Sequence, residues 1–230
     1  RKAPNYTAVM ADELIAIGRE DPRIVAITAG MPTGTGLSRF QAEFPTRFFD
    51  VGIAEQHAVT AAAGMAMWGL RPVVAIYSTF LNRAWDQIVY DVAMHRLPVI
   101  FAIDRAGVTG PDGPSHHGVY DMALLSKVPG MRVLAPSSAQ ELQQMLLDAL
   151  QLVDAGPVAI RYPRGSARQV DEHEIGSGLR ANRLRSGDGA VCVLAVGKMV
   201  DAALKAADRL AEHGRVIEVW DVRSCAPLDD

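Results

Sequence analysis

One carboxylate, Glu55, lies in the segment Asp50–His57, where a strand-like apolar run gives way to an Ala-rich run typical of a helix. The pattern predicts a helix over residues 55–69, with this acid in its first turn. Strand-to-helix corners of parallel sheets are where open α/β folds bind ligands. A helix N-terminus favours the ionised carboxyl, whereas burial beside Ala54 and Ala58 favours the protonated form. A carboxyl balanced between these forms can share a proton with a ring nitrogen of a bound ligand.

The longest loop-like segment, Asp104–Gly118, contains four Gly, two Pro, two Asp and two adjacent His. Connections of this length are usually functional or mobile, so a flexible surface loop is the alternative. In the functional interpretation, the turns hold Asp112, His116 and His117 at the mouth of a site, where a histidine can move protons near neutral pH. A metal site is not expected, because two neighbouring positions rarely reach one ion together.

Two other predicted strand ends carry aromatic and cationic residues. Tyr77, Phe80 and Arg83 follow one strand, and Arg161 and Arg164 follow another. Phe80 could be ordinary core and Arg83 an ordinary solvated side chain. However, three guanidinium groups that converge on one sheet edge favour an anionic substrate, because their planar donors match phosphate.

Short apolar runs alternate with longer helix-like segments over the first 165 residues. This alternation predicts an α/β fold, a doubly wound and mostly parallel sheet with helices on both faces. The predicted strands are residues 24–28, 48–51, 73–77, 99–103, 132–134 and 158–161, and the predicted helices are 8–19, 55–69, 83–95 and 138–153.

The later part of the chain changes character. Residues 166–186 are polar without sustained periodicity, which predicts a linker. A new cycle then follows, with a strand at 190–196, a helix at 199–213 and a strand at 215–221. We therefore expect residues 1–165 to form one domain and residues 187–230 to open a second α/β domain that is cut short.

Composition limits the class of protein. The chain has 230 residues, 49% hydrophobic composition and a net charge of −3, which gives no electrostatic reason to expect binding to nucleic acid or to an anionic membrane. No apolar run approaches the roughly 18–20 residues that span a bilayer. The two cysteines, Cys192 and Cys225, are far apart, which favours reduced thiols and a cytoplasmic protein.

Four segments in order carry a family resemblance. The chain resembles the 1-deoxy-D-xylulose-5-phosphate synthases, which belong to the transketolase-like thiamine diphosphate enzymes. The segments are Asp50–Val59, Ala75–Gln87, Ile103–Gly118 and Ile160–Gly165. The resemblance implies a pyrimidine-binding domain followed by the start of the C-terminal domain.

The resemblance also implies roles for single residues near the cofactor. Glu55 would hydrogen-bond the aminopyrimidine of thiamine diphosphate and act in catalysis, and Phe80 would stack on that ring. Ile53 would contribute to the cofactor site. His116 would handle protons at the reacting centre, and His117 receives no role.

Further implied residues bind the substrate. Tyr77, Arg83, Asp112 and Arg161 match positions that bind glyceraldehyde 3-phosphate. The implied reaction joins pyruvate to this aldehyde with loss of CO₂ and gives 1-deoxy-D-xylulose 5-phosphate, a precursor of isoprenoids, thiamine and pyridoxal.

The implied Mg²⁺ has no ligands in this chain. Gly187–Gly189 resembles the start of the motif whose Asp and downstream Asn hold Mg²⁺ and diphosphate, but the last asparagine, Asn182, precedes it. We therefore expect the metal ligands on an N-terminal domain of the same polypeptide, with this chain a piece of a longer protein that pairs as a homodimer.

Two alternatives remain open at this point. One is the beta chain of a two-subunit transketolase or 2-oxo acid dehydrogenase, which would lack the Mg²⁺ motif. The other is a catalytically silent module for interaction or regulation, against which the presence of Glu55 and His116 argues.

Overall fold

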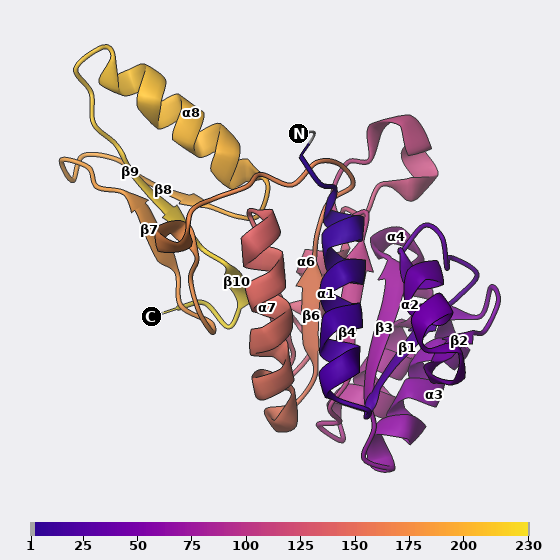
Figure 1. The fold of residues 1–230 in the computed structure, drawn as a ribbon. Helices are drawn as coiled ribbons and strands as arrows, with labels where there is room; N and C mark the ends of the chain where they lie inside the picture. Colours follow the sequence, from indigo (N-terminus) through magenta and orange to yellow (C-terminus); the bar gives the residue numbers. More distant parts are fainter. Residues whose placement is uncertain (1–2, 230) are drawn as a thin grey trace.

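A seven-stranded sheet organises the computed structural model, which describes residues 3–229 (Figure 1). The strand order is β10-β5-β6-β4-β3-β1-β2, and every neighbouring pair except β10–β5 is parallel. The predicted α/β class with a mostly parallel sheet is therefore confirmed. The strands are β1 (Ile24–Thr28), β2 (Phe48–Asp50), β3 (Arg71–Tyr77), β4 (Ile100–Asp104), β5 (Arg132–Leu134), β6 (Val158–Arg161) and β10 (Ser224–Ala226).

Helices cover both faces of this sheet because successive strand residues point to opposite sides. In β4, Ile100 and Ala102 pack with one hydrophobic core, and Phe101 and Ile103 pack with the other. The first core lies under α1 (Tyr6–Glu20), α2 (Leu37–Glu43) and α7 (Ala139–Leu152). The second lies under α3 (Glu55–Met67), α6 (Asp121–Leu125) and the segment from α4 (Ser78–Leu81) to η3 (Ile88–Ala93).

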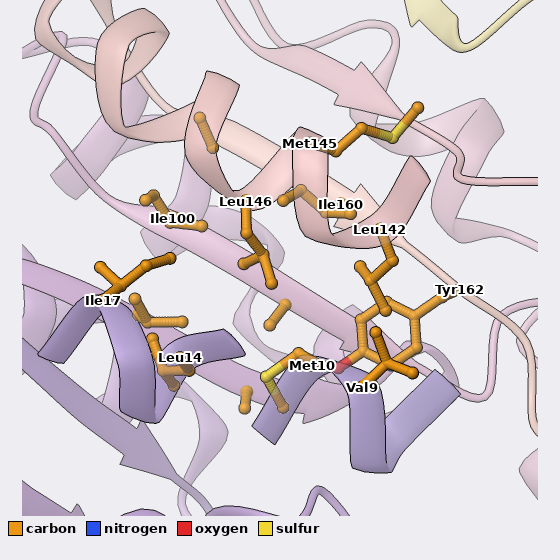
Figure 2. Close-up of a cluster of buried hydrophobic side chains, with 14 of the residues drawn as sticks. Val9, Met10, Leu14, Ile17, Ile100, Leu142, Met145, Leu146, Ile160 and Tyr162 are labelled. Atoms are coloured by element: carbon orange, nitrogen blue, oxygen red, sulfur yellow. The ribbon is translucent and has the colours of Figure 1, made fainter. Parts of the chain in front are cut away.

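Within the first core, α1 and α7 contact each other and lie side by side over the sheet (Figure 1). Figure 2 shows Met10 and Leu14 from α1 facing Leu142 and Leu146 from α7, over the strands. These four side chains are at most 2% exposed. Full burial of each contributes about 1.5–3 kcal/mol relative to exposure, so this layer stabilises the packing of both helices on the sheet.

The helix predicted over residues 83–95 is wrong in type. The structure has the 3₁₀ turn η2 (Asn82–Ala84), the short α5 (Trp85–Gln87) and the π-helix η3. Ile88, Val92 and Ala93 are buried, whereas Tyr90 and Met94 are exposed. Inward positions four and five residues apart suit the wider π turn, which is why an α-helical period does not describe this stretch.

A smaller sheet follows, in the order β7-β9-β8. Its strands are β7 (Asn182–Arg185), β8 (Cys192–Ala195) and β9 (Glu218–Asp221), and α8 (Met199–Ala211) packs on one face. The predicted strands at 190–196 and 215–221 and the helix at 199–213 are thus present with shorter bounds. The predicted linker, however, contains β7. The sequence does not reveal this strand because Arg183 and Arg185 are exposed and only Leu184 packs inward, so no apolar run marks it.

The last strand returns to the first sheet. β10 pairs antiparallel with β5 through Ser224 opposite Leu134 and Ala226 opposite Val133. The sequence assigns residues 187–230 to a second domain, and within that segment these three residues pair with the first sheet. A three-residue antiparallel edge strand needs no apolar run, so the sequence pattern does not reveal it.

A buried arginine lies between β9 and β10. Arg223 is fully buried, and its Nε donates to Glu141 Oε2 at 2.7 Å. Its Nη1 donates to the carbonyl oxygens of Gly178 at 3.0 Å and of Arg180 at 2.9 Å. The side chain thereby ties the connection that precedes β7 to α7.

Across the described residues, no helix is long and apolar enough to cross a membrane.

Candidate active site

The carboxyl ends of β3, β4 and β6 bring the predicted site residues to one edge of the main sheet. Tyr77 lies opposite Asp104 in the parallel register of β3 and β4, and Ile103 lies opposite Arg161 in β4 and β6. Side chains at these ends and on the loops that follow them therefore lie close together, as expected for a parallel sheet.

Glu55 begins α3 and is 2% exposed. The turn before it is fixed by Asp50 Oδ1, which accepts hydrogen bonds from the backbone N of Gly30 at 2.7 Å and of Gly52 at 3.0 Å. Ile53, within the same turn, is 84% exposed. The corner thus presents a desolvated acid beside an open apolar side chain.

Arg83 is the hydrogen-bonded partner of this acid. Its Nη1 donates to Glu55 Oε1 at 3.0 Å, while about half of the arginine side chain is exposed. Its guanidinium carbon is 5.4 Å from the centre of the Phe80 ring. The structure therefore brings Arg83, predicted as a substrate residue, to the predicted acid and the predicted stacking residue.

Phe80 belongs to a group of three rings at the mouth of the site. It stacks on Tyr77 at 5.9 Å between ring centres and meets the edge of His116 at 5.3 Å. His116 is half-buried, and its Nδ1 lies 3.1 Å from Ser115 Oγ. Burial raises the pKa of the Tyr77 phenol despite the nearby Arg105, so this hydroxyl remains a donor at neutral pH.

The loop that carries His116 is closed at its base. Gly107 and Gly118 exchange two backbone hydrogen bonds, at 2.7 and 2.9 Å. A Cβ at position 118 would lie 2.3 Å from the side chain of Ser78, so only glycine fits there. Thr79 Oγ1 donates to the carbonyl of Ser115 at 3.1 Å. These contacts hold the loop against the end of β3.

The adjacent histidines have different surroundings. The backbone N of Thr109 donates to His117 Nδ1 at 3.1 Å, and the hydroxyl of Thr109 lies 3.0 Å from the same atom. His117 therefore stabilises the loop through its contacts with Thr109, a structural role for a histidine to which the sequence assigned none. Within residues 3–229, no group of three or more His, Cys, Asp or Glu side chains could hold a metal ion.

Asp112 lies between two arginines. Its carboxylate is 2.5 Å from Arg164 Nη1 and 3.8 Å from Arg105 Nε. The Arg105 guanidinium carbon is 4.2 Å from the centre of the Tyr77 ring. Both arginines line a cavity of about 500 Å³ that also touches Thr7 and Gly34. Arg105 received no predicted role, although its place directly after a buried strand was a usable signal.

Arg161 faces a different cavity. Its Nε donates to Asp121 Oδ2 at 2.6 Å, and Asp121 is 2% exposed. The cavity that it lines, about 510 Å³, runs to Lys198 and Asp201 at the start of α8. The structure thus groups Arg105 with Arg164, and leaves Arg161 paired with its own carboxylate.

Comparison with known families agrees with this architecture. A family model described as "Transketolase, pyrimidine binding domain" matches residues 2–169, and one described as "Transketolase, C-terminal domain" matches residues 179–230.

Curated relatives share about half of the residues. A protein of Gloeobacter violaceus is 52% identical over 233 residues, and one of Mycobacteroides abscessus is 52% identical over 229 residues. Each is named 1-deoxy-D-xylulose-5-phosphate synthase, and each alignment covers 98% of this chain. The chain spans 36% of the length of either relative.

Solved structures share the fold. A split-gene transketolase, described as an inactive beta4 tetramer, has a TM-score of 0.86 and 31% identity, with 99% of this chain and 74% of that chain covered. A Pichia stipitis transketolase in complex with sedoheptulose 7-phosphate has a TM-score of 0.83, with 97% of this chain and 35% of that chain covered. Its identity is 18%, so this likeness concerns the fold alone.

Proposed function

Because the chain belongs to the family of transketolase pyrimidine-binding domains, we propose that it is the central part of a thiamine diphosphate-dependent 1-deoxy-D-xylulose-5-phosphate synthase. The proposed reaction joins pyruvate to glyceraldehyde 3-phosphate, releases CO₂ and yields 1-deoxy-D-xylulose 5-phosphate. The relatives at 52% identity support this choice of reaction over that of a 2-oxo acid dehydrogenase. The observation that carries the proposal is the buried carboxylate of Glu55, which is 2% exposed. It is hydrogen-bonded to Arg83, and the guanidinium of Arg83 lies over the ring of Phe80.

The residues present fit the pyrimidine end of thiamine diphosphate. Glu55 offers a buried carboxylate to a ring nitrogen, Phe80 offers a face for stacking, and Ile53 offers an exposed apolar side chain. When bound, the cofactor would supply the electron sink that lets pyruvate lose CO₂. We assign the diphosphate and Mg²⁺ to a separate N-terminal domain.

The chain's own residues would orient the ring and manage protons. Glu55 would hold a proton at the pyrimidine nitrogen, and Arg83 would fix the carboxylate through its hydrogen bond to Oε1. His116, at the edge of the Phe80 ring, would move protons at the reacting carbon and oxygen. Tyr77 would donate its hydroxyl to the acceptor aldehyde.

We assign the phosphate of the aldehyde to Arg105 and Arg164 rather than to Arg161. The first two line one cavity beside Tyr77, and Asp112 lies between them as an anion that a phosphate could replace. Asp112 would then be free to accept from the substrate hydroxyls. Arg161 lines the neighbouring cavity instead, and its Nε is bound to Asp121, whereas the Nε of Arg105 has no hydrogen-bond partner among the described residues.

Substrate assays with the full-length protein test the reaction. With thiamine diphosphate, Mg²⁺ and pyruvate, glyceraldehyde 3-phosphate should be converted to the five-carbon ketose phosphate, and a lipoyl acceptor should remain unmodified. Acyl transfer to the lipoyl acceptor would identify a dehydrogenase beta chain instead. Failure to bind thiamine diphosphate would favour a silent module.

Arginine variants test the phosphate site. Arg105→Ala or Arg164→Ala should each raise the KM for glyceraldehyde 3-phosphate about 10- to 100-fold, because a charged hydrogen bond contributes roughly 1.5–3 kcal/mol. Arg161→Ala is the matched change in the neighbouring cavity and should raise this KM less than either. A larger effect at Arg161 would restore the sequence-based assignment.

The partners and location are part of the same proposal. We propose that two copies pair as a homodimer through a face at the ends of α3 and η3, two elements in contact, whose exposed apolar side chains are Met67, Trp68, Tyr90 and Met94, each at least 58% exposed. Trp68→Glu with Tyr90→Glu should then yield monomers in sedimentation analysis, and an unchanged dimer would exclude this face.

The free thiols Cys192 and Cys225 support a cytoplasmic enzyme. We also propose the division expected from the sequence, a pyrimidine-binding unit over residues 1–165 and a C-terminal unit over 187–230, with β7 inside the connection between them.

A further inference from the structure

Asp104, the last residue of β4, is a buried acid directly beneath the cavity that Arg105 and Arg164 line. We propose that Asp104 is a positioning residue that holds Arg105 in place for the phosphate of the acceptor aldehyde. This inference rests on the proposed function and extends it to a residue that touches neither cofactor nor substrate.

The carboxylate first fixes the backbone of Arg105. Oδ1 accepts a hydrogen bond from the Arg105 backbone N at 2.7 Å. Arg105 has a φ of 59°, in the left-handed region that residues with a side chain enter only at a cost. The next residue is held as well, since Ala106 N donates to the carbonyl of Tyr162 at 3.0 Å. Asp104 therefore stabilises the sharp turn that aims the arginine toward the cavity.

The second carboxylate oxygen fixes the guanidinium. Asp104 Oδ2 lies 3.1 Å from Arg105 Nη1 and accepts a hydrogen bond from Thr7 Oγ1 at 2.7 Å. Nη1 also donates to the carbonyl of Gly34 at 2.5 Å. Tyr77 covers the guanidinium with its ring. One carboxylate thus sets both ends of the same side chain, and Thr7 of α1 sets the carboxylate.

Arg105 has one donor that is available to a substrate phosphate. Arg105 Nε is buried and has no hydrogen-bond partner among the described residues, while Asp112 is its neighbour at 3.8 Å. A phosphate that replaces Asp112 would meet this donor. Asp104 stays bound to Arg105 throughout, so the guanidinium keeps its orientation when its loop partner is exchanged.

The ion pair with Arg105 and the hydrogen bond from Thr7 favour the charged form of Asp104. Complete burial raises the pKa of this carboxyl, and the charge of Arg105 and the Thr7 hydroxyl oppose that shift. A buried acid without these partners would be strongly destabilising, so its pairing with Arg105 is built into the fold.

Kinetics of the full-length Asp104→Asn enzyme test the proposal. The amide would turn an N–H toward Arg105 or Thr7, and the KM for glyceraldehyde 3-phosphate should rise about 10- to 100-fold, the effect that loss of an orienting partner has on metal-binding residues. The KM for D-glyceraldehyde, which has no phosphate, should change less than about twofold, and kcat should stay near that of the wild type. Asp121→Asn is the matched control, because it breaks the buried pair with Arg161, and it should leave the ratio of the two KM values unchanged.

A second pair of variants keeps the test decisive if Asp104→Asn does not fold. Thr7→Val removes only the hydroxyl that holds Asp104, and it should raise the KM for the phosphorylated aldehyde selectively, while Thr7→Ser should restore it. An equal rise of both KM values, or no rise in either variant, would overturn the positioning role. A wild-type enzyme that does not use glyceraldehyde 3-phosphate would instead refute the proposed function.

Discussion

Among residues 3–229, two buried glutamates each bind an arginine, and their surroundings differ. Glu55 is 2% exposed, but the side chain of its partner, Arg83, is 51% exposed and reaches it with one donor at 3.0 Å. Glu141 and Arg223 are both fully buried, and Arg223 also binds two backbone carbonyls.

This difference separates a pair suited to chemistry from a pair suited to structure. In the Glu141–Arg223 pair, both carboxylate oxygens are engaged, since Gly176 N donates to Oε1 at 2.5 Å. In the Glu55–Arg83 pair, one carboxylate oxygen has a hydrogen-bond partner among the described residues, and that partner is half-exposed, so a ligand that displaces Arg83 could bind the acid. The same two residue types therefore support a different role in each place, and burial of the partner decides which.

The largest effect should come from Glu55→Ala. Turnover of the full-length enzyme should fall about 10²–10⁴-fold, or about 3–5 kcal/mol of barrier, which is typical for loss of an acid–base group. The free energy of unfolding should change little, because Arg83 can remain solvated. Near wild-type turnover, measured at saturating thiamine diphosphate, would contradict the assignment of Glu55.

Arg223→Met should have the opposite profile. Removal of one partner from a buried pair leaves Glu141 uncompensated and should lower the free energy of unfolding by about 3–5 kcal/mol. Urea unfolding at pH 7 measures this change. The KM values should stay close to those of the wild type at temperatures where the variant is folded. A variant as stable as the wild type would show that the pair is not a structural clamp.

The smallest effect concerns pH and the neighbour of this clamp, Asp221. Burial raises its pKa to about 6, opposed by the hydroxyl of Ser137 and by Arg223 and reinforced by Glu141. The native state therefore takes up a proton between about pH 6 and 4, before the unfolded state does, so this group adds stability as pH falls through that window. Relative to the wild type, Asp221→Asn should be more stable at pH 7.5 than at pH 4.5. Equal differences at both pH values would argue against a raised pKa.

The parts of the fold that the sequence predicts are those buried on both faces. β1, β5 and β6 have the predicted bounds, because strands that are apolar throughout stand out from their polar connections. β7 and β10 were missed, since one packs a single apolar residue inward and the other pairs along its backbone at the sheet edge. The π-helix η3 could not be predicted from the sequence pattern either, because the choice between an α and a π turn depends on the residues that the helix packs against.

The candidate site was predictable residue by residue but not pair by pair. Glu55 was visible because a lone acid interrupts an apolar corner, and the loop with Asp112 and His116 because of its Gly and Pro content. Which arginine serves which carboxylate depends on distant segments. Asp121 binds Arg161 across 40 residues of chain, and Asp112 lies between Arg105 and Arg164, so local sequence could not show which guanidinium pairs with which carboxylate.

The return of β10 to the edge of β5 has a consequence for how the protein can be divided and made. During synthesis, the outer edge of β5 stays unpaired until more than eighty further residues, up to β10, have been made. Until then its backbone donors and acceptors can pair with other chains. A fragment ending near residue 169 would keep that edge bare. We expect such a fragment to associate with itself, and a peptide containing residues 222–228 to suppress the association by supplying the missing strand.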